Sequence, residues 1–284
     1  MQTTPTKKRT LARRLASRLP IAYVCLIYIF LYLPIIVVIA FSFNTSKQNI
    51  VFEGFTFGWY ARMFDNSTLM ESFYNTLIVA FSSTAISVVI GTLCAVGLFK
   101  LESRLKSIIS SSLYIPIAIP EIVFGISLLM FFSMIHLETG MLTVILSHVT
   151  FSMPFVVITV RSRIAGFDRS IEEAARDLGA NELRTLMRVT VPMLMPGIIS
   201  GGMLALTLSL DDVVISSFTT GPDCVTLPIK IMGLVKKGVS PDVNALSTMM
   251  IAGTVAVMVL STVLQNRLEG KEVRDKAKAT ADKL

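Results

Sequence analysis

The chain contains the stretch Ser170-Ile-Glu-Glu-Ala-Ala-Arg-Asp-Leu-Gly179, a polar segment between two long apolar runs. Ser170 and Glu173 have the spacing of a capping box, in which a serine hydroxyl and a later glutamate satisfy backbone N–H groups at a helix start. Gly179 suits the left-handed conformation that ends a helix. The apolar residues between these ends recur at helical spacing and predict one apolar face, made of Ile171, Ala174, Ala175 and Leu178. We therefore predict an amphipathic helix that a protein outside the membrane binds.

A second short amphipathic run follows Gly179 and carries Leu183, Leu186 and Met187. Nine residues separate Gly179 from the stretch Val189-Thr-Val-Pro192. Proline lacks a backbone N–H and clashes with the preceding turn, so we expect Pro192 to end this second helix. Two short helices joined at a glycine are thus predicted over about residues 168–192.

The rest of the chain is too apolar for a soluble domain, because 53% of its 284 residues are hydrophobic and 16% are charged. A helix needs roughly 20 apolar residues to cross a bilayer. The fold class is therefore all-α, a polytopic membrane protein with six transmembrane helices in residues 21–264, a basic tail in 1–20 and a second tail in 265–284. The predicted spans are Ile21–Phe43, Thr76–Phe99, Ile108–Phe132, Met141–Val160, Met193–Phe218 and Ala245–Leu264.

The net charge of +7 gives the orientation of the chain and does not indicate a nucleic-acid-binding surface. Basic residues gather before the first span, between spans two and three, after span four and in the C-terminal tail. The alternate connections hold few: Lys47, Arg62, Lys230, Lys236 and Lys237. The positive-inside rule then places both termini and residues 168–192 in the cytoplasm. The first apolar run is too long for a cleaved signal peptide, so we expect it to remain as a span.

Three acidic residues lie inside the predicted spans: Glu121 in the third, and Asp211 and Asp212 in the fifth. A carboxylate at the centre of a span costs roughly 2.5–3.5 kcal/mol, and no lysine or arginine lies inside the same spans. Asp211 is about 27 Å along its helix from Met193, near the outer side. One interpretation is a line of negative charge for a small organic cation. The alternatives are a helix-start position for Glu121 after Pro120, and hydrated headgroups around the aspartates.

Pro116 and Pro120 are expected to kink or break the third span. Small residues at four-residue spacing, such as Gly91 with Ala95 and Gly197 with Gly201, predict close approach of helix backbones.

The outer loop between the first two spans contains Trp59 and Tyr60. These rings are typical of the aromatic belt at the headgroup level. The alternative is a docking surface for an extracytoplasmic protein.

The chain has no pattern typical of an enzyme or a metal site. His136 and His148 are isolated, no Ser-His-Asp arrangement is visible, and we predict no catalytic and no metal-binding residues. The Gly-x-x-x-x-Gly-Lys-Ser/Thr phosphate loop is absent as well, so we do not expect this chain to hydrolyse ATP.

The 170–192 segment resembles the cytoplasmic coupling loop of ABC importer permeases, which reads Glu-Ala-Ala, three residues, Gly, nine residues, then Ile-x-Leu-Pro. Glu173, Ala174, Ala175, Gly179 and Pro192 match this pattern, while Val189 and Val191 replace the Ile and Leu. Further passages resemble the polyamine branch of the family, in particular the second permease subunit of spermidine/putrescine importers. They are Tyr32-Leu-Pro-Ile-Ile, Phe41-Ser-Phe-Asn44, Ser209-Leu-Asp-Asp-Val-Val, Ser217-Phe-Thr-Thr-Gly-Pro222, Thr226-Leu-Pro228 and Val235-Lys-Lys-Gly-Val-Ser-Pro-Asp-Val-Asn-Ala-Leu246.

The resemblance implies the type I ABC importer permease fold in a bacterial inner membrane, surrounded by lipid. It implies three protein partners: a second homologous permease, a cytoplasmic ATPase dimer that binds ATP and magnesium, and an extracytoplasmic polyamine-binding protein. Asp211, Asp212 and Glu121 are then possible polyamine contacts. The alternatives are an ABC permease for another small cationic or amino-acid-like solute, and a proton-coupled secondary transporter. A channel or an intramembrane hydrolase is less consistent with the sequence.

Overall fold

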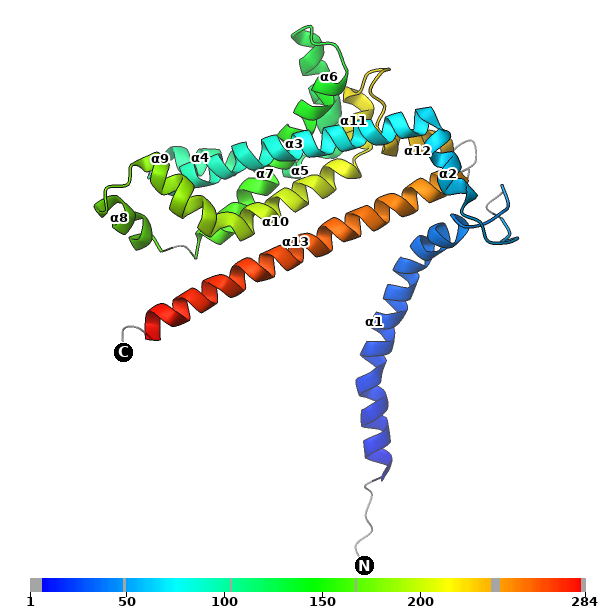
Figure 1. Cartoon of the computed structure of the whole chain (residues 1–284), viewed down its shortest axis with the longest axis horizontal. Coiled ribbons are helices and arrows are strands. Elements are labelled where there is room, and N and C mark those ends of the chain that lie inside the picture. The colour runs from blue at the N-terminus through cyan, green and yellow to red at the C-terminus, as the bar shows by residue number, and fades with distance from the viewer. Residues whose placement is uncertain (1–6, 48–49, 103, 167, 236–240, 282–284) are drawn as a thin grey trace, which may run out of the picture. The chain divides into compact units, whose positions relative to one another are not determined.

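The structure is a computed structural model that describes residues 7–47, 50–102, 104–166, 168–235 and 241–281. Its regular elements are helices, and the described residues form one isolated antiparallel bridge, between Asn44 and Phe55. This confirms the all-α prediction (Figure 1). The longer helices are α1 (Lys7–Phe41), α3 (Ser67–Lys100), α6 (Glu121–Met134), α7 (Met141–Ile164), α10 (Val191–Leu210) and α13 (Pro241–Ala281). The shorter ones are α2 (Gly58–Asp65), α4 (Arg104–Ser112), α5 (Ile115–Ala118), α8 (Ser170–Asp177), α9 (Glu182–Thr185), the π-helical turn η1 (Leu186–Thr190), α11 (Val214–Thr219) and α12 (Leu227–Val235).

The chain divides into two compact units. The first comprises residues 1–65 and 239–251, and the second comprises residues 66–238 and 252–284. The predicted coupling segment, residues 168–192, belongs to the second unit, and so do the three acidic residues of the predicted spans. Trp59 and Tyr60 belong to the first unit. Residues 236–240 of the polyamine-type motif that begins at Val235 lie outside the described residues.

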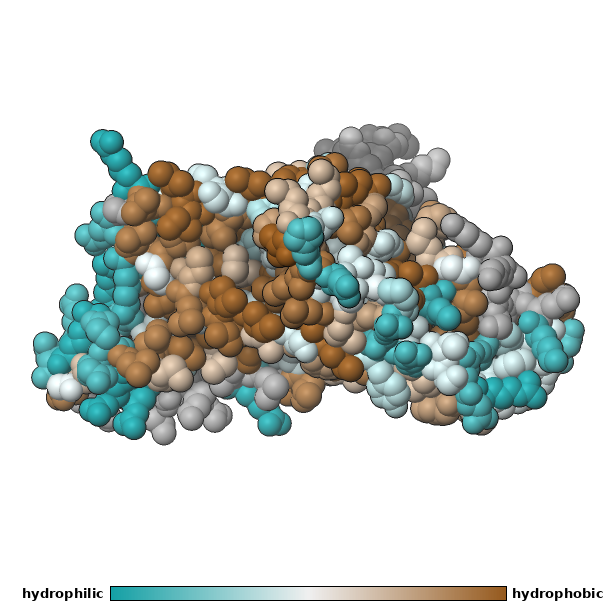
Figure 2. Space-filling model, turned by 90° about the horizontal axis from the view of Figure 1, so that it is seen from above, coloured by the Kyte–Doolittle hydropathy of each residue, from teal (hydrophilic) through white to brown (hydrophobic). Residues whose placement is uncertain are grey.

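Five described helices are long and apolar enough to cross a membrane, and a bent pair of helices supplies a sixth span if it crosses as one. The five are Pro20–Phe41, Ser67–Lys100, Met141–Ile164, Glu182–Leu210 and Pro241–Val263. Hydrophobic residues cover a wide continuous area of the face shown in Figure 2. On α3 the exposed side chains include Phe81, Val89 and Leu93, as expected of a helix surface in contact with lipid.

The third predicted span is broken, as the prolines indicated. The helical segments Arg104–Ala118 and Glu121–Met134 meet at 107°. Pro120 is the N-cap of α6, with φ −55° and ψ 132°, so the chain leaves helical geometry there and restarts at Glu121. A smaller interruption precedes Pro116: α4 ends at Ser112, and α5 restarts at Ile115 with Pro116 in its first turn, where a missing N–H costs nothing.

The fifth span ends earlier than Phe218, the residue predicted from hydropathy, because α10 stops at Leu210. Asp212 explains this correction. Its carboxylate accepts the backbone N–H groups of Ile215 (3.1 Å) and Ser216 (2.7 Å), which starts the separate helix α11. The apolar run Val213–Phe218 therefore belongs to a second short helix beyond a break at the two aspartates.

The core of the second unit lies among α3, α7 and α10, which pack against one another. Val156 of α7 is fully buried at the centre of this packing. A Cβ atom at Gly91 of α3 would lie 2.9 Å from the Val156 Cβ, and one at Gly201 of α10 would lie 3.2 Å from the Val156 Cα. Both glycines thus allow the close helix approach that their spacing predicted.

Replacing Gly91 by leucine is expected to separate α3 from α7, because the Cβ atom alone would already lie 2.9 Å from the Val156 side chain. Overpacking of this kind typically costs about 1–3 kcal/mol. The thermal unfolding temperature of the purified protein should fall. Gly97→Leu on the same helix is the control, because a Cβ there meets nothing within 4 Å. Equal unfolding temperatures for the two variants would contradict this account of the packing.

Candidate functional site

The coupling segment begins at Asp168 and not with the capping box predicted from Ser170 and Glu173. No side chain caps the first turn at Arg169, and the backbone N–H of Ser170 donates to Asp168 Oδ1 at 3.0 Å. The backbone and side-chain hydrogen bonds from Ser170 lower the pKa of Asp168 below its ordinary value. The capping-box prediction is wrong because an aspartate two residues before Ser170 takes the first free N–H group. The helix itself spans Ser170–Asp177, close to the prediction.

Gly179 ends α8 as predicted, with φ +86° in the left-handed region. The N–H of Gly179 donates to the Arg176 carbonyl (2.8 Å), and the N–H of Ala180 donates to the Ala175 carbonyl (3.0 Å). These two bonds form a Schellman motif. They turn the chain into α9, whose N-cap is Asn181; the Asn181 side chain accepts the Arg184 N–H at 2.8 Å.

Pro192 does not end the second helix, which corrects the prediction. The helix continues from α9 through the π turn η1 into α10, and Pro192 lies in the first turn of α10. The Val191 N–H donates to the Leu186 carbonyl, five residues back. In this wider turn the carbonyl groups before Pro192 lie in other positions than in a regular α-helix. The helix therefore continues through the proline.

The apolar side chains of the coupling segment are exposed. The exposed fraction is 37% for Ile171, 89% for Leu178, 68% for Leu183 and 60% for Met187. Ala174 is exposed and Ala175 is half-buried, and the side chain of Glu173 is also exposed. Figure 1 shows α8 and α9 at one end of α3 and α10. The predicted face therefore lies free at the end of a packed group of helices, as a surface for another protein requires.

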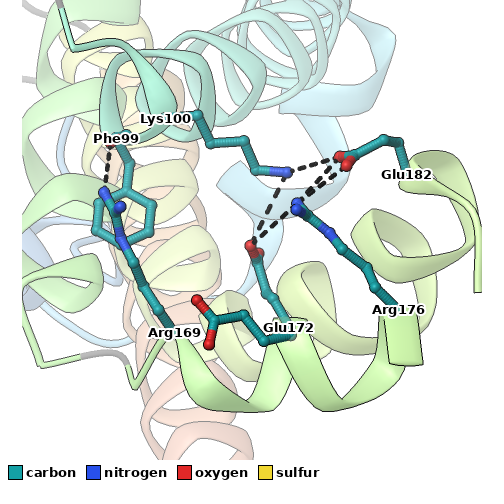
Figure 3. A pocket seen from close by; sticks show the side chains of 7 residues that line it. Phe99, Lys100, Arg169, Glu172, Arg176 and Glu182 are labelled. Carbon is teal, nitrogen blue, oxygen red and sulfur yellow. Dashed lines mark hydrogen bonds and ion pairs between the residues drawn. The ribbon is translucent and has the colours of Figure 1, made fainter. Parts of the chain in front are cut away.

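Glu172 of α8 lies outside the predicted apolar face and is nevertheless buried, with 5% exposure. Its Oε1 accepts a 2.5 Å hydrogen bond from the Thr190 hydroxyl, while its Oε2 lies 3.9 Å from Lys100 Nζ and 4.0 Å from an Arg176 nitrogen. Lys100, Glu172 and Arg176 line a pocket of about 300 Å³ together with Glu182. Figure 3 shows these four side chains pointing toward one another. Helical spacing alone does not reveal this cluster, because Lys100 is far away in the sequence.

The two aspartates at the end of α10 have different surroundings. Asp211 is the C-cap of α10 and is exposed, and it has no ion-pair partner among the described residues. The side chain of Asp212 is 6% exposed, and its Oδ2 lies 3.3 Å from His148 Nε2. The buried polar partner of Asp212 is therefore the His148 ring of this chain. Asp211 is left as the aspartate that is free to meet a solute.

His148 is not the lone ring that the sequence suggested. It is 3% exposed, its Nδ1 hydrogen-bonds Ser209 Oγ at 2.6 Å, and its Nε2 hydrogen-bonds Ser216 Oγ at 2.9 Å. Ser209 is also bonded to Ser83 of α3 at 3.1 Å. The ring thus joins α7 to α10 and α11, and through Ser209 to α3.

Glu121 is the first residue of α6 and is exposed. A carboxylate in the first turn is stabilised by the helix dipole. The structure thus places Glu121 where the helix-start interpretation expected it. A polyamine contact at this carboxylate stays a prediction.

Trp59 shapes the outer loop of the first unit. Its side chain is buried, its indole N–H donates to the Asn44 carbonyl at 2.6 Å, and the Arg62 guanidinium lies 4.9 Å from the ring centre. The Tyr60 hydroxyl is 2.8 Å from Ser42 Oγ. A docking role for Trp59 and Tyr60 stays a prediction, and the exposed aromatic rings of this loop include Phe55, Phe57 and Phe64.

The described residues contain no group of three or more His, Cys, Asp and Glu side chains that could hold a metal ion. The ring of His148 has two hydroxyl groups and one carboxylate as its polar neighbours, and these suit hydrogen bonding.

Residues 87–271 match the protein family described as "Binding-protein-dependent transport system inner membrane component". The chain is 39% identical over 246 residues to the spermidine/putrescine transport system permease protein PotC of Haemophilus influenzae, covering 87% of this chain and 96% of the relative. It is 42% identical over 238 residues to PotC of Escherichia coli strain K12, covering 84% and 90%. It is also 37% identical over 255 residues to the putrescine transport system permease protein PotI of the same strain, covering 87% and 91%.

Two solved structures show a similar fold. One is a bacterial ABC transporter involved in the import of alginate, with a TM-score of 0.64 and 16% identity over 94% of this chain and 99% of that chain. The other is the MetNI methionine ABC transporter, with a TM-score of 0.60 and 17% identity over 70% of this chain and 95% of that chain. Both confirm the predicted ABC importer permease fold.

Proposed function

The chain belongs to the family of inner-membrane components of binding-protein-dependent transport systems, and from this membership we propose that it is one of two permease subunits of an ATP-driven polyamine importer. Its helices form part of the translocation pathway, and the segment of α8 and α9 couples that pathway to a cytoplasmic ATPase. The observation that carries the proposal is the exposed apolar face of this segment, which includes Ile171, Leu178, Leu183 and Met187.

A polyamine is the cargo that fits both the relatives and the charges of this chain. The relatives named above are spermidine/putrescine and putrescine permeases. Spermidine and putrescine are small organic cations, and Asp211 offers an exposed carboxylate without an ion-pair partner among the described residues. A cation that has lost part of its water in a pathway is stabilised by such a group. Glu121 is a second, weaker candidate contact.

The coupling mechanism needs partners, because this chain has no phosphate loop. ATP and magnesium bind to the cytoplasmic ATPase dimer. The dimer contacts the apolar face of the coupling segment in this chain and the corresponding face of a second homologous permease. The loaded extracytoplasmic binding protein docks on the outer loops. Closure of the ATPase dimer then moves the coupling segments and opens the pathway outward, and hydrolysis returns it to the inward-facing state. The free energy of ATPase binding at Ile171, Leu178 and their neighbours thus drives the change of the pathway between its inward-facing and outward-facing states.

The orientation follows from the charge distribution. Basic residues favour the cytoplasmic side, so both termini and α8 lie in the cytoplasm of a bacterium and Asp211 lies toward the outer side of its inner membrane. This arrangement places the coupling segment where the ATPase is and the free carboxylate where the binding protein delivers its cargo.

Reconstitution of the complete complex in liposomes tests the proposal. We expect labelled spermidine or putrescine to accumulate only when three conditions are met together. The complex contains its ATPase, ATP is enclosed in the liposomes, and the loaded binding protein is present outside them. Histidine is the control for an amino-acid-like solute, and a proton ionophore is the control for proton coupling. Polyamine accumulation without the ATPase, abolished by the ionophore, would instead identify a secondary transporter. Accumulation of histidine but not of polyamine would refute the polyamine assignment.

A further inference from the structure

The C-terminal end of α3 is tied to the coupling segment by ionic contacts (Figure 3). Lys100 Nζ lies 3.2 Å from Glu182 Oε2 and 3.9 Å from Glu172 Oε2. Arg176 shares both partners, with one nitrogen 3.0 Å from Glu182 Oε1 and 4.0 Å from Glu172 Oε2. Two cations and two carboxylates thus alternate across the junction of three helices, one cation coming from α3 and the other from α8.

A second contact fastens the same end of α3. Arg169, directly before α8, donates from Nη2 to the Phe99 carbonyl at 3.1 Å, and its guanidinium lies 4.3 Å from the centre of the Phe99 ring. Its Nη1 is 3.6 Å from Glu102 Oε1. The last carbonyls of a helix have no partner inside the helix and carry partial negative charge, so a guanidinium suits this position.

The burial of Glu172 makes the cluster more than a set of surface ion pairs. Exposed pairs contribute little, because water and salt screen them. A buried carboxylate, however, needs charged or hydrogen-bonding partners in place of the water that it has lost. Thr190 supplies one hydrogen bond, and the remaining oxygen faces Lys100 and Arg176. Lys100 therefore helps to keep Glu172, and with it α8, in a defined position.

We propose that Lys100 and Arg169 are positioning residues that make the end of α3 and the coupling segment move as one body. This inference rests on the proposed function of the coupling segment. The chain connects that segment directly to α7 and α10, while α3 has no such connection. Through Lys100 and Arg169, displacement of α8 by the ATPase also reaches α3, which packs against both other helices. All three helices of the core are then moved together.

The first test measures polyamine molecules transported per ATP hydrolysed by the reconstituted complex. In Lys100→Met we expect the ATPase to copurify normally and basal hydrolysis to persist, while transport per ATP falls about fivefold or more, the lower end of typical coupling between two sites. Lys100→Arg should retain the wild-type ratio. Arg104→Met is the matched control, since Arg104 is exposed near the same helix end. A wild-type ratio in Lys100→Met, or a loss that only follows reduced assembly, overturns the proposal.

A covalent link gives an independent test. Lys100→Cys and Glu182→Cys are combined in a chain whose native cysteines are replaced by serine. The double variant should transport poorly, and a short thiol-specific bifunctional cross-linker should restore transport per ATP. Unchanged or further reduced transport after cross-linking overturns the proposal. If the wild-type complex itself takes up no polyamine, the proposed function fails, and this outcome is distinct from a wild-type complex that is active and insensitive to position 100.

Discussion

Replacing Gly179 by valine is expected to abolish polyamine uptake by the assembled importer. Gly179 has φ +86°, a conformation that a β-branched residue rarely adopts. The Schellman hydrogen bonds that reverse the chain between α8 and α9 depend on this conformation. With valine the two helices lose their fixed angle, and the exposed side chains of Leu178 and Leu183 no longer form one surface. Uptake and polyamine-stimulated ATP hydrolysis in proteoliposomes should fall to background.

Two further substitutions separate backbone conformation from simple bulk. Gly179→Asn should keep substantial activity, because asparagine tolerates the left-handed region better than other residues. Gly166→Val, in the connection just before α8, should be close to wild type, because no positive φ is required there and a Cβ meets only the Arg163 carbonyl at 3.9 Å. Polyamine-stimulated hydrolysis at the wild-type level in Gly179→Val would contradict the proposed role of this turn.

The second large effect separates Asp211 from Asp212. Asp211→Asn should assemble and unfold like the wild type but lose uptake at least about tenfold, because a charged hydrogen bond contributes about 1.5–3 kcal/mol. Asp212→Asn should instead lower the thermal unfolding temperature, since it leaves His148 without its carboxylate and removes one acceptor from the start of α11. Leaving a buried polar group without its partner typically costs about 1–3 kcal/mol. Uptake normalised to complex amount, together with unfolding curves, distinguishes the two.

A double-mutant cycle provides the control for Asp212. If His148 and Asp212 act as a pair, His148→Gln and Asp212→Asn together should destabilise the complex by less than the sum of the single effects. Strict additivity would show that the two side chains are independent.

For Asp211, normal uptake in Asp211→Asn at normal expression would show that this carboxylate is not part of the pathway.

Local features of the sequence were sufficient for much of the architecture. The apolar runs located the spans, since crossing a bilayer imposes a length on each helix. The turn at Gly179 and the break at Pro120 were predicted because glycine and proline act through their own backbone geometry. The cap of α8 was assigned wrongly although the competing residue, Asp168, lies only two positions from Ser170. Two capping residues this close together give alternatives that local pattern alone does not rank.

Features that depend on distant residues were missed for a different reason. His148 and Asp212 come from separate segments of the chain, so neither the hydrogen-bonding partner of Asp212 nor the structural role of the histidine follows from spacing. Lys100 meets Glu172 only after α3, α7 and α10 have packed. The end of the fifth span was placed too late because hydropathy stays high through Val213–Phe218, whereas the break is determined by hydrogen bonds to Asp212.

The π turn at Leu186–Thr190 determines the rotational phase between the coupling segment and the membrane helix that follows it. One extra residue is accommodated in this turn, and successive residues of an α-helix are separated by about 100° around its axis. Deleting one residue from the turn would let α-helical bonding run through without interruption. Because a π turn holds about one residue more than an α turn, this deletion would leave α9 at nearly the same rotation relative to α10 and keep Glu182 near Lys100. A single-residue deletion from the regular α-helical part of α10 would instead rotate the coupling segment by about 100° relative to the rest of that helix and disengage the ATPase-facing surface from the spans.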